Sequence, residues 1–175
     1  EKKVFLMDFW NSGTAVHGCL AAGRQAGYFY INWNGDVTPC VFVPYAATNI
    51  HEIYDQGGTI MDLMEIDFFK RIREWQKSYG YKTKPMETKN LIMPCVHRDH
   101  VDVLFPLIKE YNAKPINQEA DRALKDPSYY DGLYNYDRAC ATVLDPVWEK
   151  EYLRGETVRI EIPKMQEEPV SEATH

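Results

Sequence analysis

Two β-rich runs, YFYINW (28–33) and VTPCVFV (37–43), lie on either side of the dipeptide Asn34-Gly35. Asn-Gly is a preferred pair for a tight hairpin turn, so the stretch predicts a β-hairpin. Pro39 has no N–H to donate to a strand ladder. We therefore expect the returning strand to be an edge strand or to bulge at that proline.

Helical periodicity follows the hairpin over residues 59–78. Thr59 is the predicted N-cap, and Asp67 is a candidate cap for a second segment if the helix is broken. The apolar positions recur at intervals of three and four residues and predict a core-facing stripe made of Met61, Met64, Phe68, Ile72 and Trp75. We interpret this stripe as core packing.

Further elements are expected on both sides of this region. The runs 4–10 and 158–162 read as strands, and the glycine-rich segment 11–27 and the segment 44–58 read as loops. A helix is predicted after residue 100, with Asp99 as its cap and Pro106 as a kink. The remaining predicted helices cover 118–125 and 129–153.

Composition excludes several classes of protein. The 175 residues carry 20 Lys and Arg against 26 Asp and Glu, for a formal net charge of −6, which disfavours nucleic-acid binding. No apolar run approaches the roughly 20 residues that span a bilayer, and no signal peptide is evident. We expect a cytoplasmic protein with no nucleic-acid or membrane partner.

Four cysteines, Cys19, Cys40, Cys95 and Cys140, are separated by 21, 55 and 45 positions. Common zinc modules take ligands from pairs roughly two to four residues apart, so the spacing argues against them. A disulfide framework is compatible with the even count, although nothing indicates secretion. Reduced thiols packed in the core are the simplest alternative.

A hairpin brings the residue before its first strand close to the residue that ends its second strand. Cys19 and Cys40 are therefore expected to approach each other, and the helix over 59–78 returns the chain so that Cys95 can join them. Three thiolates that meet across distant loops suit an iron–sulfur cluster, whose irons prefer soft ligands. Spacing alone does not decide between a cluster and inert core thiols.

The string GCLAAGRQAGYFYINWNGDVTPCVFVPYAATNI (18–50), followed by FFKRIREWQ (68–76) and MPC (93–95), resembles the C-terminal auxiliary-cluster region of radical S-adenosylmethionine enzymes, the SPASM/twitch type. The resemblance covers roughly residues 5–148. It implies an α+β fold in which a β-hairpin and helix bind one [4Fe–4S] cluster, with a mostly helical C-terminal extension. It also implies that Cys19, Cys40 and Cys95 are ligands.

The resemblance also implies a domain organisation. Residues 1–10 would be the exit strand from an upstream barrel domain, 11–112 the auxiliary cluster domain, 113–162 a helical extension and 163–175 a flexible acidic tail. The CxxxCxxC motif that binds S-adenosylmethionine through its own cluster is absent from this sequence. We therefore expect a non-catalytic part of the enzyme, with no catalytic residue of its own.

The chain lacks the further cysteines of a full SPASM domain, so one cluster is implied and its fourth ligand is open. Cys140 ranks slightly ahead of His17 and of an iron left open to solvent, substrate or the missing domain. Weaker candidates follow the third cysteine, namely His97, Asp99 and His100. Arg24 is a candidate cofactor-binding residue, since its charge can balance that of a thiolate-ligated cluster.

The expected function is electron transfer or substrate anchoring in a radical S-adenosylmethionine enzyme. Its expected partners are the upstream barrel domain and a peptide or protein substrate, and S-adenosylmethionine would bind only to that barrel. Two alternatives remain, namely zinc bound at the same thiolates and a metal-free structural or interaction domain.

Overall fold

The predicted hairpin is present, with a longer turn than expected. A computed structural model describes residues 13–157, in which β1 (Tyr30–Ile31) pairs antiparallel with β2 (Asp36–Thr38). The Gly35 N–H donates to the Asn32 carbonyl oxygen at 3.0 Å, and Gly35 has a φ of +84°. The hairpin therefore turns through three residues with glycine in the left-handed position, instead of the tight turn expected at Asn34-Gly35.

β2 is the central strand of its sheet, which corrects the expectation of an edge strand. β4 (Thr48–Asn49) pairs with its other side, and the strand order is β1-β2-β4. β2 ends at Thr38, immediately before Pro39. The missing proline N–H is thus accommodated by ending the strand.

The segment 44–58, expected to be a loop, contains regular structure. It holds β3 (Tyr45–Ala46), β4 and α2 (Ile50–Asp55). β3 pairs antiparallel with β5 (Lys114–Pro115) and forms a second, two-stranded sheet. These strands are only two residues long, which is too short for a period-two pattern to reveal them.

The helix predicted over 59–78 is divided into two parts. Thr59 caps the 3₁₀ helix η1 (Ile60–Glu65) in a capping box with Asp62, as its sequence position predicts. Ile66 adopts an extended conformation, and α3 (Asp67–Tyr79) then begins. Asp67 is therefore the first residue of α3, and its expected role as a side-chain cap is wrong.

The later helices agree well with the prediction. They are α4 (Val101–Glu110), which runs through Pro106, α5 (Gln118–Lys125) and α6 (Pro127–Val147), which continues as the π-helix η3 (Trp148–Leu153). Two short elements complete the described chain, α1 (Gly13–Val16) and η2 (Pro85–Glu87). The strands expected at 4–10 and 158–162 and the acidic tail lie outside the described residues.

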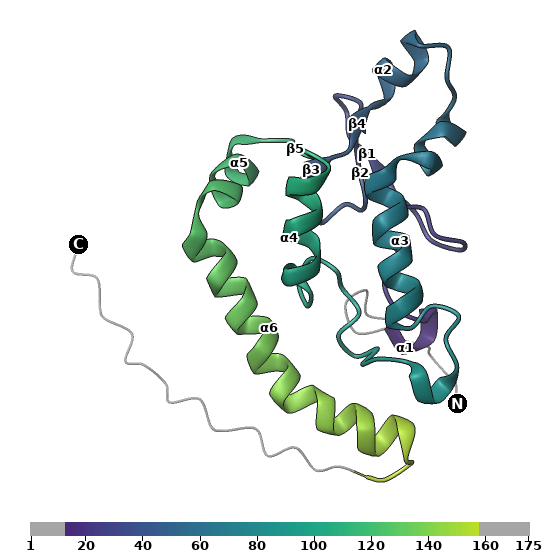
Figure 1. Ribbon diagram of the computed structural model, residues 1–175, viewed down its shortest axis with the longest axis vertical. Helices are drawn as coiled ribbons and strands as arrows, with labels where there is room; N and C mark the ends of the chain where they lie inside the picture. The colour runs from purple at the N-terminus through teal and green to yellow at the C-terminus, as the bar shows by residue number, and fades with distance from the viewer. Residues whose placement is uncertain (1–12, 158–175) are drawn as a thin grey trace, which may run out of the picture.

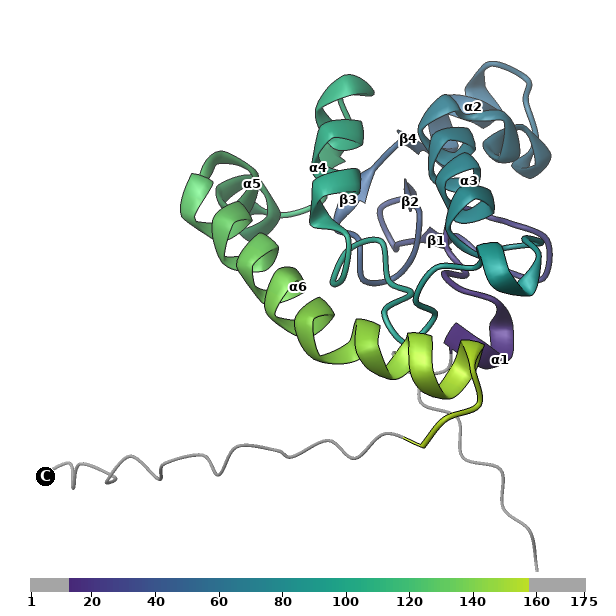
Figure 2. The same cartoon turned by 60° about the horizontal axis from the view of Figure 1, so that its bottom comes forward.

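The arrangement is α+β, with two small antiparallel sheets followed by a mostly helical part. α3 contacts α4, and α6 packs along α4 and α5 (Figure 1). Both views show α6 running from α5 toward α1 (Figure 2). Buried side chains between these layers form one core whose largest members include Tyr45, Phe68, Phe69, Ile72, Leu104 and Ile108.

Of the predicted apolar stripe, Phe68 and Ile72 are buried, whereas Met61 is 69% exposed. The break at Ile66 separates η1 from α3, so the stripe does not continue in one direction. Among the described residues, no helix combines the length and apolarity needed to cross a bilayer.

We expect Phe69→Ala to lower the free energy of unfolding by about 3–5 kcal/mol, because it removes a fully buried ring from α3. Urea denaturation followed by circular dichroism measures this change. Met61→Ala is the matched control, and its exposed side chain predicts a change within about 0.5 kcal/mol. Similar losses in the two variants would contradict the assigned core.

Candidate functional site

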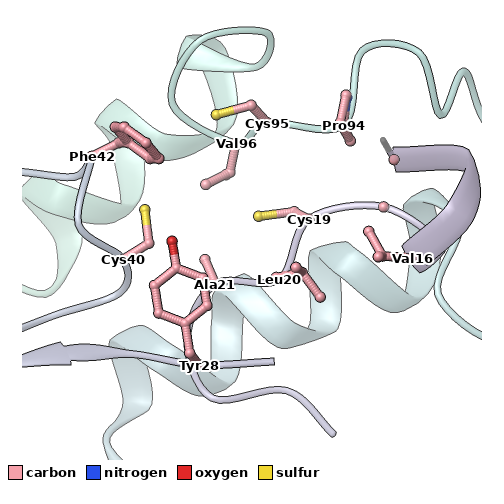
Figure 3. Close-up of a pocket in the computed structure, with 12 residues that line it drawn as sticks. Val16, Cys19, Leu20, Ala21, Tyr28, Cys40, Phe42, Pro94, Cys95 and Val96 are labelled. Atoms are coloured by element: carbon pink, nitrogen blue, oxygen red, sulfur yellow. The ribbon is translucent and has the colours of Figure 1, made fainter. Parts of the chain in front are cut away.

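Three cysteines from separate segments line one cavity of about 40 Å³. Cys19 follows α1, Cys40 follows β2, and Cys95 precedes α4. Their sulfur atoms point toward a common space (Figure 3). The rest of the lining is largely apolar and includes Leu20, Ala21, Phe42, Pro94 and Val96.

Hydrogen bonds hold the loop of Cys19 against the rest of the site. The Ala22 N–H donates to the Pro39 carbonyl oxygen at 2.7 Å, which joins this loop to the residue before Cys40. From α3, Arg73 donates to the Ala22 carbonyl oxygen at 2.8 Å, and Gln76 donates to the preceding carbonyl at 2.9 Å. The loop is therefore fixed from both the sheet and the helix.

Cys40 and Cys95 occupy equivalent Pro-Cys turns. In each turn the backbone N–H groups of the second and third residues after the cysteine lower the pKa of its thiol. At Cys95 the third-residue donor, the Arg98 N–H, lies 3.3 Å from Sγ. Donors of this kind stabilise the thiolate form over the thiol. Both turns are thus suited to present a thiolate to the cavity.

Asp99 stabilises the turn of Cys95. Its carboxylate accepts the Cys95 N–H at 2.9 Å, and its own N–H donates to the Cys95 carbonyl oxygen at 2.9 Å. Arg98 forms an ion pair with this carboxylate, which is almost fully buried. Asp99 was expected to cap the following helix, but the N-cap residue of α4 is His100, so that expectation is wrong.

Tyr28 is a cavity residue that the sequence analysis assigned no role. Its hydroxyl group lowers the pKa of the neighbouring Cys40 thiol, and Figure 3 shows it pointing toward the space between the cysteines. Burial, followed by repulsion from the cysteines, raises the pKa of Tyr28 to about 12. No sequence pattern distinguishes this tyrosine from Tyr30, because only the packed loops bring it to the sulfurs.

The electrostatics of the cavity keep the thiols of Cys40 and Cys95 protonated. Burial, followed by proximity to Cys19, raises the pKa of Cys40 to about 12. The pKa of Cys95 is also raised to about 12, again by burial first and by Cys19 second. Ionising the group of sulfurs therefore requires positive charge in the cavity.

Arg24 supplies a buried positive charge next to this site. Its guanidinium donates to the carbonyl oxygens of Val16 and His17 and lies 4.2 Å from the centre of the Tyr81 ring. Burial lowers the pKa of Arg24, whereas attraction to Cys19 raises it. The structure thus brings the predicted cofactor-binding arginine close to the first cysteine.

The other candidate ligands lie outside the cavity. Cys140 is on α6 and its sulfur interacts with Tyr136, while His17 contributes its backbone carbonyl oxygen to Arg24. Neither residue belongs to the cavity lining.

The two histidines after Cys95 also lie outside the cysteine cavity. His100 pairs with the Met93 carbonyl oxygen at 2.9 Å and packs against the Tyr79 ring. Burial lowers the pKa of both His97 and His100. Neither histidine lines the cavity.

Within residues 13–157, no three Cys, His, Asp or Glu side chains are arranged to hold one metal ion. The three cysteines share a cavity without forming a mononuclear site. Sites for a single zinc ion require ligand atoms about 2.0–2.3 Å from the metal. The observed arrangement does not provide such a site.

No protein-family model, curated protein or solved structure matches the chain. The functional interpretation therefore depends on the cavity residues and on the motif over 18–50.

In the reduced, metal-free protein, we expect iodoacetamide to alkylate Cys140 well before Cys40. At about pH 8, a thiol with a pKa near 12 has a very small thiolate fraction, and Cys40 is also buried. Peptide mass spectrometry after timed quenching measures each rate. Urea provides the control, since unfolding should make the rates similar. Faster alkylation of Cys40 in the folded protein would contradict the assigned environment.

Proposed function

We propose that this chain binds one [4Fe–4S] cluster between Cys19, Cys40 and Cys95 and serves as an auxiliary cluster domain of a radical S-adenosylmethionine enzyme. One observation carries the proposal, namely that three thiols from three distant segments line a single, largely apolar cavity. Cysteines that serve only as core packing need not share one cavity.

The donor chemistry of the cavity supports a cluster. Iron–sulfur clusters are held by cysteine thiolates, and hydrogen bonds to sulfur tune their reduction potential. The Arg98 N–H donates to the Cys95 sulfur, and the backbone N–H groups after Cys40, together with the nearby Tyr28 hydroxyl, lower the pKa of the Cys40 thiol. Arg24 offers compensating charge near Cys19.

A single zinc ion needs its ligands gathered about one point, and the described residues contain no such group. The irons of a cluster are spread over several ångströms, so a cluster can take ligands from thiols that are further apart.

The finer fold assignment belongs to the same proposal. The β1–β2 hairpin carries Cys40 at its exit, and α3 fixes the loop of Cys19 through Arg73 and Gln76. This arrangement of a hairpin and a helix around the cysteine loops is similar to the twitch form that the motif over 18–50 suggests. The helices from α4 to η3 would then be the C-terminal extension.

Three cysteines leave one iron without a protein thiolate. Because Cys140 and His17 lie outside the cavity lining, we favour an open position that solvent, a substrate or the barrel domain occupies. This choice revises the initial preference for Cys140 and follows from where the side chains lie.

A cluster bound here would supply one-electron redox chemistry or an anchoring iron for substrate. The residues of this chain would limit water access through the apolar lining and set the potential through the sulfur hydrogen bonds. The proposed partners are an upstream barrel domain and a peptide or protein substrate, within the reducing cytoplasm.

Anaerobic reconstitution with iron and sulfide tests the proposal. We expect a brown protein with about four irons and four inorganic sulfides per chain and visible absorbance typical of thiolate-ligated clusters. Cys40→Ser or Cys95→Ser should abolish most of this absorbance, because each removes a ligand. Iron and sulfide assays with electron paramagnetic resonance after reduction measure the outcome.

Cys140→Ser is the matched control and should retain the cluster, since Cys140 does not line the cavity. Stoichiometric zinc with no iron uptake would favour the zinc alternative. A thermal midpoint unaffected by metal, chelator or Cys19→Ala would favour the metal-free alternative. Either result would overturn the cluster proposal.

A further inference from the structure

A second and larger cavity lies on the other side of the Cys95 segment. It is a groove of about 680 Å³ between the face of α6 and η3 and the chain from the end of α3 to the start of α4. Its volume falls within the range of about 300–1,000 Å³ typical of small-ligand sites.

The groove is acidic. Six carboxylate side chains line it, whereas Lys89 and Arg138 are its two side chains with a full positive charge. The carboxylates come from four separate parts of the fold and are Glu87, Asp99, Asp102, Asp137, Asp145 and Glu149. Some already have partners, since Asp99 pairs with Arg98 and Asp145 accepts from Asn90 at 2.8 Å.

Asp137 differs from these carboxylates because one of its two oxygen atoms is buried without a partner within residues 13–157. It is 94% buried, since only 6% of its surface is exposed, and its Oδ2 atom accepts the Val101 N–H at 3.2 Å. Its Oδ1 atom is buried and has no hydrogen-bond partner among the described residues. Leaving a buried carboxylate oxygen unpaired is unfavourable, which makes this atom a candidate acceptor for a donor group on a ligand.

Asp137 is mainly ionised at neutral pH. Burial, with the nearby Asp99 and Asp102 carboxylates, raises its pKa to about 6, while the Val101 N–H and Arg98 oppose the increase. The unpaired oxygen therefore carries negative charge under ordinary conditions, and a cationic donor would satisfy it best.

Aromatic side chains line another part of the groove. Trp75, Tyr79 and His100 pack together with ring centres 4.5–5.1 Å apart, and Tyr134 and Trp148 line the groove from α6 and η3. Aromatic faces next to carboxylates attract organic cations through the ring quadrupole.

A metal ion fits this groove poorly. Although six carboxylates line it, the described residues contain no group of three that could hold one ion. Dispersed carboxylates around aromatic rings suit a larger, delocalised or alkyl-substituted cation.

We propose that this groove binds an organic cation of the guanidinium or alkylammonium kind, with Asp137 Oδ1 as its principal acceptor. The proposal stands without the cluster, because the groove contains none of the three cysteines proposed as cluster ligands. Met93 and Asp99 line the groove, while Pro94, Cys95 and Val96 line the cysteine cavity. A cation bound in the groove would thus lie behind the same short segment that carries Cys95.

Titration of the full 175-residue chain with blocked peptides tests the proposal. The probe is acetyl-Gly-Arg-Gly-amide, and the matched ligand control replaces arginine with neutral citrulline, which has nearly the same shape. We expect the arginine peptide to bind, with a change in the fluorescence of Trp75 and Trp148, and the citrulline peptide to bind at least about tenfold more weakly. Spermidine forms a separate arm, and tighter binding of spermidine than of the peptide would identify a free polyamine as the cation.

Asp137→Asn is the decisive variant because it retains an acceptor for the Val101 N–H and removes the charge. We expect it to weaken binding of the cation by about 10–100-fold without lowering the thermal midpoint, since it also removes a buried unpaired charge. Asp102→Asn, at an exposed position in the groove, should weaken binding less. Asp131→Asn is the matched control, an exposed α6 carboxylate outside the groove.

Equal binding of the arginine and citrulline peptides would overturn the proposal. So would unchanged affinity in Asp137→Asn, or an equal loss of affinity in Asp131→Asn. Failure of both the arginine peptide and spermidine to bind would also overturn it. Because these measurements need no iron, their outcome is separate from that of the cluster reconstitution.

Discussion

The hydrogen bond from the Ala22 N–H to the Pro39 carbonyl oxygen joins the two loops on which the cysteine cavity depends. It fixes the loop of Cys19 against the exit of the hairpin, next to Cys40. Arg73 and Gln76 hold the same loop from α3. The cavity therefore has the rigidity of the sheet and the helix, although its cysteines all lie on loops.

Backbone N–H groups near the cavity stabilise negative charge on the sulfur atoms of Cys40 and Cys95. Without metal, burial and the proximity of Cys19 keep Cys40 and Cys95 protonated. Yet both sulfurs also receive backbone donors, an arrangement that favours thiolates. The two effects would act together if a positively charged centre occupied the cavity, because that charge would stabilise the thiolates. A thiolate-bound metal cluster would supply such a centre.

The segment from Met93 to His100 connects this cavity to the acidic groove. Cys95 faces the cavity, whereas Asp99 holds the Cys95 turn and also lines the groove. A shift of the Asp99 carboxylate would move the Cys95 backbone, because a hydrogen bond joins the two groups. The fold thus offers a short structural path between a bound cation and the sulfur site, with the unpaired Asp137 oxygen at its far side.

Local patterns were enough to predict the hairpin, the Thr59 cap and the later helices, because turn chemistry, capping and helical periodicity act over a few residues. The two-residue strands, the break at Ile66 and the role of Asp99 required the tertiary structure, since contacts between distant segments determine them. The positions of Tyr28 at the cavity and of Asp137 in the groove also required the tertiary structure. Their neighbours come from elements far apart in the chain, and no spacing within the sequence specifies which polar atom packing leaves unpaired.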